Sequence, residues 1–441
     1  MIITSSINNY IKLILFSSYI LCWISISTTF QDIIAAKEMS EFEFKKIFNL
    51  VRHVSIYFCL IFAILINFFI LINHNFSFKK NLLFFFLILY FLSQLPGLFL
   101  TENSLENFSF IASSLTIVLI IIASDHFLSF KEKMGFVKIS LIILFCVFMM
   151  SFFPKLFLFL KAESSMYGGV IDYDDFFVGK MSPRSSGISR SALIILILID
   201  IVTYYKNKNR SFVVYFYRAF FITSILVLQS RTILVLTLFY LITIFIIDQN
   251  FTIKKILKFI FAFILTPIFF AFVIFNIHIH NYYLKKNIDS EFNLNLKSMV
   301  ENSKKPIRLI DEGNFTSGRY EDWNNLLIEF KENKKNIFFG YGAQADRYLI
   351  NQSASNGILY ALSASGLIGL IFYFIFSLLV VFKILRKIYY LKKDNIYNYL
   401  IYLIILIIFA RSILESSYAV FSIDLIILLT FVNFIRKQNL N

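Results

Sequence analysis

Short polar segments in an otherwise apolar chain carry arginines in positions that could bind anions. The arginines are Arg184, Arg190, Arg231, Arg319 and Arg411. A guanidinium group presents a planar fork of N–H donors that matches two oxygens of a phosphate group. A single such arginine is equally well explained as a side chain that reaches from a helix end to lipid headgroups. Because the pattern recurs, it predicts a site for a polyanion such as a pyrophosphate.

Two carboxylates accompany these arginines at short spacing. Glu415 lies four residues after Arg411, and Asp322 lies three residues after Arg319. A general base beside a reacting hydroxyl contributes about 10²–10⁴-fold to the rate of group transfer. Glu415 is the first candidate for that base and Asp322 the second. The alternative for Glu415 is an ion pair with Arg411, one helical turn away.

The sequence offers little for a metal ion. Asp172, Asp174 and Asp175 could bind a divalent cation, but a carboxylate cluster in a loop is more often a solvated surface. The three cysteines lie inside apolar runs without the spacing of metal ligands. Arginines can also neutralise a leaving group without a metal. We therefore expect neither a metal nor a cofactor.

Composition decides which kind of protein must position these residues. Of 441 residues, 58% are hydrophobic and only 16% are charged, whereas soluble domains are about 45–50% apolar and 25% charged. These values exclude a soluble protein and predict an all-α polytopic integral membrane protein surrounded by lipid. The net charge of +15 is then a matter of loop orientation, and no nucleic-acid partner is expected.

Apolar runs of about 17–25 residues mark the expected transmembrane helices. The first run has no clear cleavage site, so it is interpreted as a helix rather than a signal peptide. About twelve runs are found, at residues 10–29, 54–73, 82–100, 108–124, 137–160, 188–204, 212–229, 232–248, 256–276, 357–382, 397–414 and 419–435.

Basic residues in the short loops predict the orientation. Lysines and arginines concentrate in alternate loops, at 79–80, 131–138, 206–210, 254–258 and 383–393, and in the tail after residue 435. Short basic loops stay in the cytoplasm, so both termini are expected there. Residues 30–51 disagree, because they hold three lysines on the predicted outside. The arginines singled out above all fall on the extracytoplasmic face.

The expected organisation has four parts. Residues 1–160 form the N-terminal transmembrane helices, and residues 161–276 form central helices with outer-face arginines. Residues 277–356 form one large extracytoplasmic loop between late helices, and residues 357–441 form the C-terminal helices. A loop of that length is usually either functional or disordered.

The order of motifs over residues 180–420 resembles the O-antigen polymerase and ligase superfamily. Its members carry a large loop between two late helices, with an arginine early in the loop and an Asn-x-x-Leu-like start of the next helix. The matching residues here are Arg184-x-x-Gly187, Ser230-Arg231, Ser317-Gly318-Arg319, Trp323, Phe339-Gly340-Tyr341-Gly342, Ser353-Ala354-Ser355-Asn356, Gly357, Gly366, Gly369, Arg411 and Glu415.

The resemblance implies an enzyme of the bacterial cytoplasmic membrane that works on undecaprenyl-pyrophosphate-linked glycans. Ligases typically place a His before the Asn that starts the late helix, whereas Ser355 stands there in this chain. This departure favours a polymerase, which transfers a growing chain onto the sugar of an incoming lipid-linked unit. A chain-length regulator is a further partner that the resemblance leaves open.

The residue roles follow from what glycosyl transfer needs, which is stabilisation of the departing pyrophosphate and activation of an acceptor hydroxyl. The expected catalytic residues are Arg231, Arg319 and Glu415. The expected substrate-binding residues are Arg184, Arg190, Tyr320, Asp322, Asn356 and Arg411.

Three other functions compete with this interpretation. A ligase that transfers finished polymer and a lipid-dependent protein glycosylase share the same resemblance. A flippase for lipid-linked saccharides belongs to another class and suits twelve helices. Transporters, however, often show internal repeats and broken helices at the membrane midplane, and the sequence shows no clear repeat.

Overall fold

The protein consists of helices throughout the part of the chain that its computed structural model describes. That part comprises residues 5–27, 43–73, 78–100, 104–161, 166, 185–205, 212–247, 257, 260–289, 319–332, 336–350, 353–390 and 396–437. No strand occurs within these ranges. An all-helical architecture suits lipid, because a helix pairs its backbone N–H and C=O groups within one segment.

Among the described residues, eight helices are long and apolar enough to cross a membrane, and four further apolar helices are shorter. This identifies a helical membrane protein, and each of the twelve predicted apolar runs overlaps one of these helices. They are α1 (Ser5–Ser27), α3 (Glu43–Asn73), α4 (Phe78–Leu92), α5 (Ser104–Phe127), α6 (Phe130–Leu160), α7 (Ser185–Tyr205), α8 (Phe212–Leu228), α9 (Arg231–Ile247), α11 (Thr266–Asp289, preceded by a π-helical turn at Phe261–Leu265), α15 (Gly357–Tyr390), α16 (Ile396–Ser412) and α17 (Ile423–Lys437).

Several helices run past the apolar runs that predicted them. Helix α3 begins at Glu43 rather than at residue 54, and α11 continues to Asp289 rather than ending at residue 276. Helix α6 begins at Phe130, where Ser129 and Glu132 form a reciprocal capping box. Hydropathy marks only the apolar part of a helix, whereas caps and polar turns extend it at either end.

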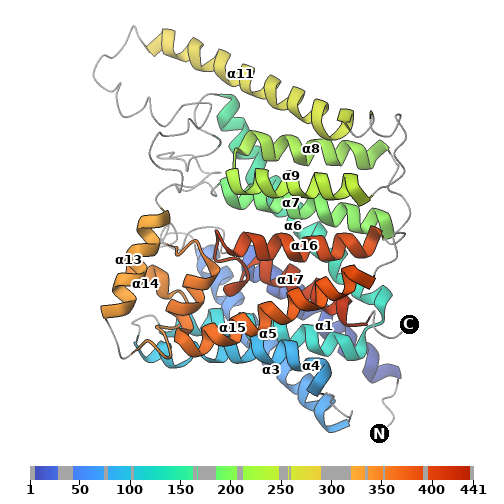
Figure 1. Ribbon diagram of the computed structural model, residues 1–441, viewed down its shortest axis with the longest axis vertical. Coiled ribbons are helices and arrows are strands. Elements are labelled where there is room, and N and C mark those ends of the chain that lie inside the picture. Colours follow the sequence, from blue (N-terminus) through green and yellow to red (C-terminus); the bar gives the residue numbers. More distant parts are fainter. Residues whose placement is uncertain are drawn as a thin grey trace.

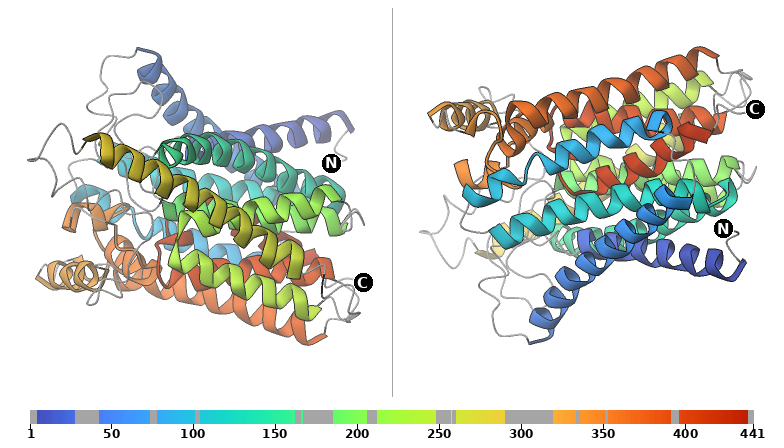
Figure 2. Two further views of the ribbon diagram at one scale, coloured as in Figure 1. Left: turned by 90° about the horizontal axis from the view of Figure 1, so that it is seen from above. Right: turned by 90° about the horizontal axis from the view of Figure 1, so that it is seen from below.

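The helices form one bundle with two distinct ends (Figure 1). Helix α13 (Arg319–Glu332) and helix α14 (Ala345–Ile350) lie at one end, here called the loop end. Helix α1 begins and α17 ends at the opposite end, here called the terminal end, as Figure 2 also shows. Helices α5 and α7 are enclosed, whereas α3 and α11 turn many apolar side chains outward, as lipid-facing helices do.

A buried ion pair joins α7 to α8. The guanidinium of Arg218 contacts Asp200 Oδ1 through Nε at 2.7 Å and through Nη2 at 2.6 Å. The hydroxyl of Tyr240 on α9 donates to the other oxygen of Asp200. All three side chains are buried. The pairing satisfies charges that would be costly to leave alone in an apolar bundle.

A second polar network joins α5, α6 and α17 near the terminal end. Lys133 pairs with Asp125 and donates to Asn433 Oδ1 at 2.9 Å, and Asn433 in turn donates to Ser124 Oγ at 2.8 Å. Closer to the surface, Lys12 of α1 pairs with Glu132 at 2.7 Å. These contacts fix helices that are distant in sequence.

Helix α15 is broken at Gly366, whose backbone has φ +62° and ψ −165°. Such angles suit only glycine and interrupt the hydrogen-bond ladder of the helix. The groups freed by the break bond to the segment before α14. Tyr341 N donates to Ser363 O at 2.8 Å and Gly342 N to Ala364 O at 2.9 Å.

The backbone N–H groups that follow the break are also hydrogen-bonded to this segment. Leu367 N donates to Ile337 O at 2.9 Å, and Ile368 N donates to Phe338 O at 3.2 Å. The four bonds hold residues 337–342 inside the break. They also hold this segment close to α4 and the turn after it, where a Cβ on Gly97 would come within 1.9 Å of Gly342 N.

We predict that Gly366→Ala destabilises the protein. A Cβ at this position would lie 2.3 Å from the carbonyl carbon of Phe338, and the backbone conformation alone costs a non-glycine residue about 1–3 kcal/mol. Thermal unfolding of the detergent-purified protein should show a clearly lower midpoint.

Gly135→Ala is the matched control. Its Cβ would meet only the ring of Phe16 at 2.9 Å, and Ala is favoured over Gly inside a helix by about 1 kcal/mol. An unfolding midpoint for Gly366→Ala equal to that of the control would contradict the constraint assigned to the break.

Candidate functional site

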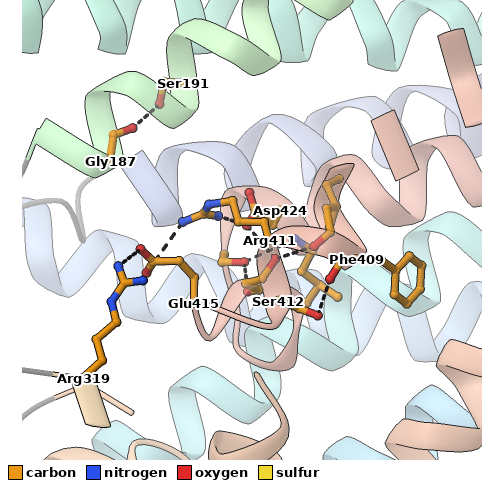
Figure 3. Close-up of polar contacts among 12 residues, drawn as sticks. Gly187, Ser191, Arg319, Phe409, Arg411, Ser412, Glu415 and Asp424 are labelled. Atoms are coloured by element: carbon orange, nitrogen blue, oxygen red, sulfur yellow. Dashed lines mark hydrogen bonds and ion pairs between the residues drawn. The ribbon is translucent and has the colours of Figure 1, made fainter. Parts of the chain in front are cut away.

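A chain of ion pairs at the loop end joins the last turn of α16 to α13 and α17. Asp424, in the first turn of α17, pairs with Arg411 Nη1 and accepts from Ser417 Oγ at 2.7 Å. Arg411 Nη2 lies 3.9 Å from Glu415 Oε2, and Arg319 Nη2 donates to Glu415 Oε1 at 3.2 Å. Figure 3 shows Arg319 and Arg411 on opposite sides of Glu415.

The chain of ion pairs runs from the core to the surface. Asp424 is fully buried and Arg411 is nearly so, whereas the side chains of Arg319 and Glu415 are 26% and 22% exposed. The inner pair therefore has a structural role as well as an electrostatic one. The outer pair is within reach of a ligand that approaches from the loop end.

Arg190 adds a third guanidinium group to this cluster. It lies in the second turn of α7 and interacts electrostatically with Arg411, Asp424 and Glu415. The start of α7, marked by Gly187 and Ser191, lies beside the ion-pair chain (Figure 3). With Arg319, three guanidinium groups and two carboxylates make up this cluster.

Arg231 lies at the same end of the bundle but outside this chain of ion pairs. It is half-buried at the first residue of α9, a helix that packs against α7 and α16. Among the described contacts it makes no ion pair with the cluster. The preceding Gln229 has φ +52°, so the tight junction between α8 and α9 fixes where α9 begins. Arg184 and the aspartates at 172, 174 and 175 lie outside the described residues.

Helix α13 is attached to the bundle by a relay of hydrogen bonds that also orients Arg319. Trp323 Nε1 donates to Ala354 O at 2.7 Å, and Ala354 N donates to Asp346 Oδ2 at 2.7 Å. Leu326 and Phe330 on the same helix are buried. Arg319 is the first residue of this anchored helix. The contacts that Trp323, Leu326 and Phe330 make later in α13 therefore hold it beside Glu415.

Asn356 has a structural role in the fold. Its Oδ1 accepts from Ile358 N at 2.9 Å and from Leu359 N at 3.1 Å, which caps the start of α15. Its Nδ2 donates to Ile413 O at 2.9 Å and so ties α15 to the turn that carries Glu415. Substrate binding by Asn356 stays a prediction, because these bonds already use its amide.

The remaining predicted residues sit on α13. Tyr320 is 67% exposed and Asp322 is half-buried, both within one turn of Arg319. The alternative reading of Glu415 as a partner of Arg411 matches the geometry, and its pairing with Arg319 is closer still. A carboxylate that already accepts from a guanidinium has fewer lone pairs for a substrate hydroxyl. Its role as a base stays a prediction.

Sequence reasoning missed two carboxylates at this end. Asp424 opens the last apolar helix and anchors Arg411, and a lone acid in an apolar run is a signal that could have found it. Asp346 is 2% exposed, and burial raises the pKa of its carboxyl above the ordinary value. In the sequence it stands only among turn residues after Gly342, without a motif of its own.

Backbone strain gathers at the same end. Four described residues other than glycine have positive φ, namely Gln229, Gln344, Ser355 and Ser417. They precede α9, α14, α15 and α17, respectively, each at the loop end of its helix. Strained backbone persists where surrounding contacts enforce it and is frequent at functional sites.

No family model matches the chain, and no curated protein or solved structure is significantly similar to it.

We predict that the buried and the exposed carboxylate of this cluster, Asp424 and Glu415, differ sharply in their contribution to stability. Asp424→Asn leaves the buried Arg411 without its close partner, which costs about 3–5 kcal/mol in comparable buried pairs. Glu415→Gln removes a half-exposed partner and should cost about 1 kcal/mol or less. Thermal unfolding of both variants, purified side by side, tests the difference, and equal midpoints would contradict it.

Proposed function

We propose that the protein is a polysaccharide polymerase that joins undecaprenyl-pyrophosphate-linked oligosaccharide units. The observation that carries this proposal is the cluster of three arginines at one end of an apolar bundle. A lipid-linked pyrophosphate has the charge that such a cluster binds and an apolar tail that such a bundle accommodates. The motif resemblance over residues 180–420 supports the same reaction.

The proposed topology has twelve spans in a bacterial cytoplasmic membrane, with the loop end outside and both termini in the cytoplasm. Basic residues near the terminal end support this orientation, among them Lys133, Lys383 and Arg386. The arginine cluster is then at the level of the outer headgroups, where a lipid-linked pyrophosphate presents its charge.

In the proposed reaction an acceptor hydroxyl oxygen attacks the anomeric carbon of the donor chain. The bond from that carbon to the pyrophosphate oxygen breaks, and the hydroxyl proton passes to a base. Arg319 is reachable from the loop end and stabilises the departing pyrophosphate, with Arg231 assigned to the same leaving group. Arg190 holds the charge of the second lipid-linked substrate together with Arg184. Preorganised cations at a leaving group are usually the largest catalytic contribution.

The inner pair supports these roles from the core, and substrate binding by Arg411 stays a prediction. Asp424 forms an ion pair with Arg411, which holds that guanidinium group close to Glu415. Glu415 is therefore held between two guanidinium groups and orients Arg319. Whether it also accepts the hydroxyl proton is the part of this mechanism that a Glu415→Gln variant addresses.

A flippase is the second candidate, because the break in α15 is a feature that transporters often show. In transporters such breaks commonly line the substrate path. Here the freed backbone groups are bonded to residues 337–342, so the break is filled by protein. This occupancy favours the polymerase over the flippase.

The first test is the surface glycan of a deletion strain on gels, beside the wild type and a complemented strain. We expect lipid-bound glycan to collapse to a single repeat unit. Polymer that forms normally but stays on its lipid carrier would identify a ligase instead. A glycan profile identical to that of the wild type would contradict the proposal.

We further predict that Arg319→Ala abolishes the ladder of long chains at normal expression, and that Arg319→Lys restores little of it. Removing one charged donor from a leaving-group site typically costs about 10²–10³-fold in rate, and lysine lacks the bidentate fork. Arg386→Ala, which removes an exposed arginine near the terminal end of α15, is the matched control. Normal ladders from Arg319→Ala would refute the assignment.

A further inference from the structure

The outward face of helix α15 changes at the break. On the terminal-end side of Gly366, exposed apolar side chains recur every three or four residues and so share one face of the helix. This lipid-facing stripe consists of Leu367, Ile371, Phe374, Leu378, Phe382 and Leu385. On the other side of the break, residues 359–366 have no exposed side chain. Another part of the protein therefore covers this stretch of α15.

The segment that fills the break provides this cover. Gly340 lies so close to α15 that a Cβ on it would come within 2.6 Å of Gly366 N, and its φ of +68° turns the chain there. The side chains of Phe338 and Phe339, just before this turn, are 59% and 47% exposed. Phe338 O accepts from Ile368 N, beside the first residue of the lipid-facing stripe. Two exposed phenylalanines thus follow directly where the stripe ends.

The neighbouring helix α4 ends in another exposed phenylalanine. Helix α4 packs along α15 (Figure 1), and it is followed by a 3-10 turn at Pro96–Leu100. Gly97 in this turn packs against Gly342, and Phe99 two residues later is 92% exposed. The loop end of these two helices therefore carries a set of exposed aromatic side chains, here called the phenylalanine edge: Phe99, Phe338 and Phe339.

The length of α15 indicates how deep the break lies. The apolar core of a bilayer is about 30 Å thick and a helix rises about 1.5 Å per residue, so about 20 residues cross it. Arg386 is exposed near the terminal end of α15 and has to reach the headgroups on that side. Counting back about 20 residues from Arg386 arrives at Gly366, and a tilted helix needs more residues to cross. The break is therefore at or inside the boundary of the apolar core.

The segment itself suits that depth. Gly340 N donates to Asn336 O at 2.7 Å, and the four bonds to α15 satisfy further backbone groups. Irregular backbone is tolerated inside a membrane only where protein satisfies its polar groups in this way. Within residues 336–342 the exposed side chains are the two phenylalanines, whereas the end of α13 exposes Lys331 and Glu332. The segment therefore matches lipid, and the end of α13 matches water.

We propose that residues 336–342 re-enter the membrane from the loop end, and that the phenylalanine edge binds the acyl chains of the adjoining leaflet. The sequence alone assigns this segment to the extracytoplasmic loop of residues 277–356. Acyl chains are the occupant because the edge begins where the lipid-facing stripe of α15 ends. The segment leads directly into α14, so the contact holds α14 at the level of the headgroups. This inference does not depend on the proposed reaction.

The test replaces one residue at a time with the photoreactive amino acid p-benzoylphenylalanine, which cross-links to neighbouring C–H groups. The full-length protein is reconstituted in vesicles of phosphatidylethanolamine and phosphatidylglycerol with deuterated tails. The tested positions are Phe338 and Phe339. Leu378, in the lipid-facing stripe, is the reference for contact with lipid, and Asn324, exposed on α13, is the matched control for contact with water. Mass spectrometry after irradiation identifies what is bound.

We expect the protein labelled at Phe338 or Phe339 to gain the mass of one lipid attached through its tail, as at Leu378. The label at Asn324 should give no such adduct. Because both phenylalanines are exposed, neither replacement removes a buried side chain, and the unfolding midpoint of each labelled protein is compared with that of the wild type.

Two results would overturn the proposal. Cross-links from both positions to a second copy of the chain would show that the phenylalanine edge is a protein interface. No lipid adduct at either position, with a normal adduct at Leu378, would show that the segment lies in water. The glycan ladder of the deletion strain tests the proposed function separately, and neither result predicts the other.

Discussion

Backbone groups that lose their helical partners at Gly366 have no water to bond inside an apolar bundle, so other backbone must replace them. Residues 337–342 do so with four hydrogen bonds. This segment leads into α14, where Asp346 accepts a hydrogen bond from Ala354 N. The carbonyl oxygen of Ala354 in turn accepts a hydrogen bond from Trp323 on α13. The position of Arg319 at the head of α13 therefore depends on a glycine in a helix 47 residues further along the chain.

Charge at the loop end is ordered by depth. The most buried members, Asp424 and Arg411, form the closest pair, and the more exposed Glu415 and Arg319 form a looser one. A deeply buried arginine is tolerated only with such a partner, whereas an arginine near the surface can exchange its partner for a ligand. The same arrangement thus fixes the inner pair and leaves the outer arginine partly exposed.

Hydropathy alone located a helix in every one of the twelve predicted runs, because lipid imposes apolarity over the whole length of a span. It could not locate the break in α15, since Gly366 inside an apolar run has the same hydropathy whether or not the ladder continues. Four predicted site residues, Arg190, Arg319, Arg411 and Glu415, lie together. Asp424 and Asp346 were missed because no motif marks them and their contacts form only when turns bring neighbouring elements together. The sequence also could not show that the Asn356 amide caps α15, and its binding role stays a prediction.

The pair between Asp200 and Arg218 bears on how the protein is made. A charged residue near the centre of a helix adds about 2.5–3.5 kcal/mol to the free energy of its insertion. Arg218 lies near the middle of α8 and Asp200 in the last two turns of α7, so each adds a cost when its helix enters lipid alone. They are consecutive helices, separated by residues 206–211 only. When the two enter as a hairpin, each neutralises the other. A hairpin of α7 and α8 is therefore a more favourable unit to place in lipid than either helix alone.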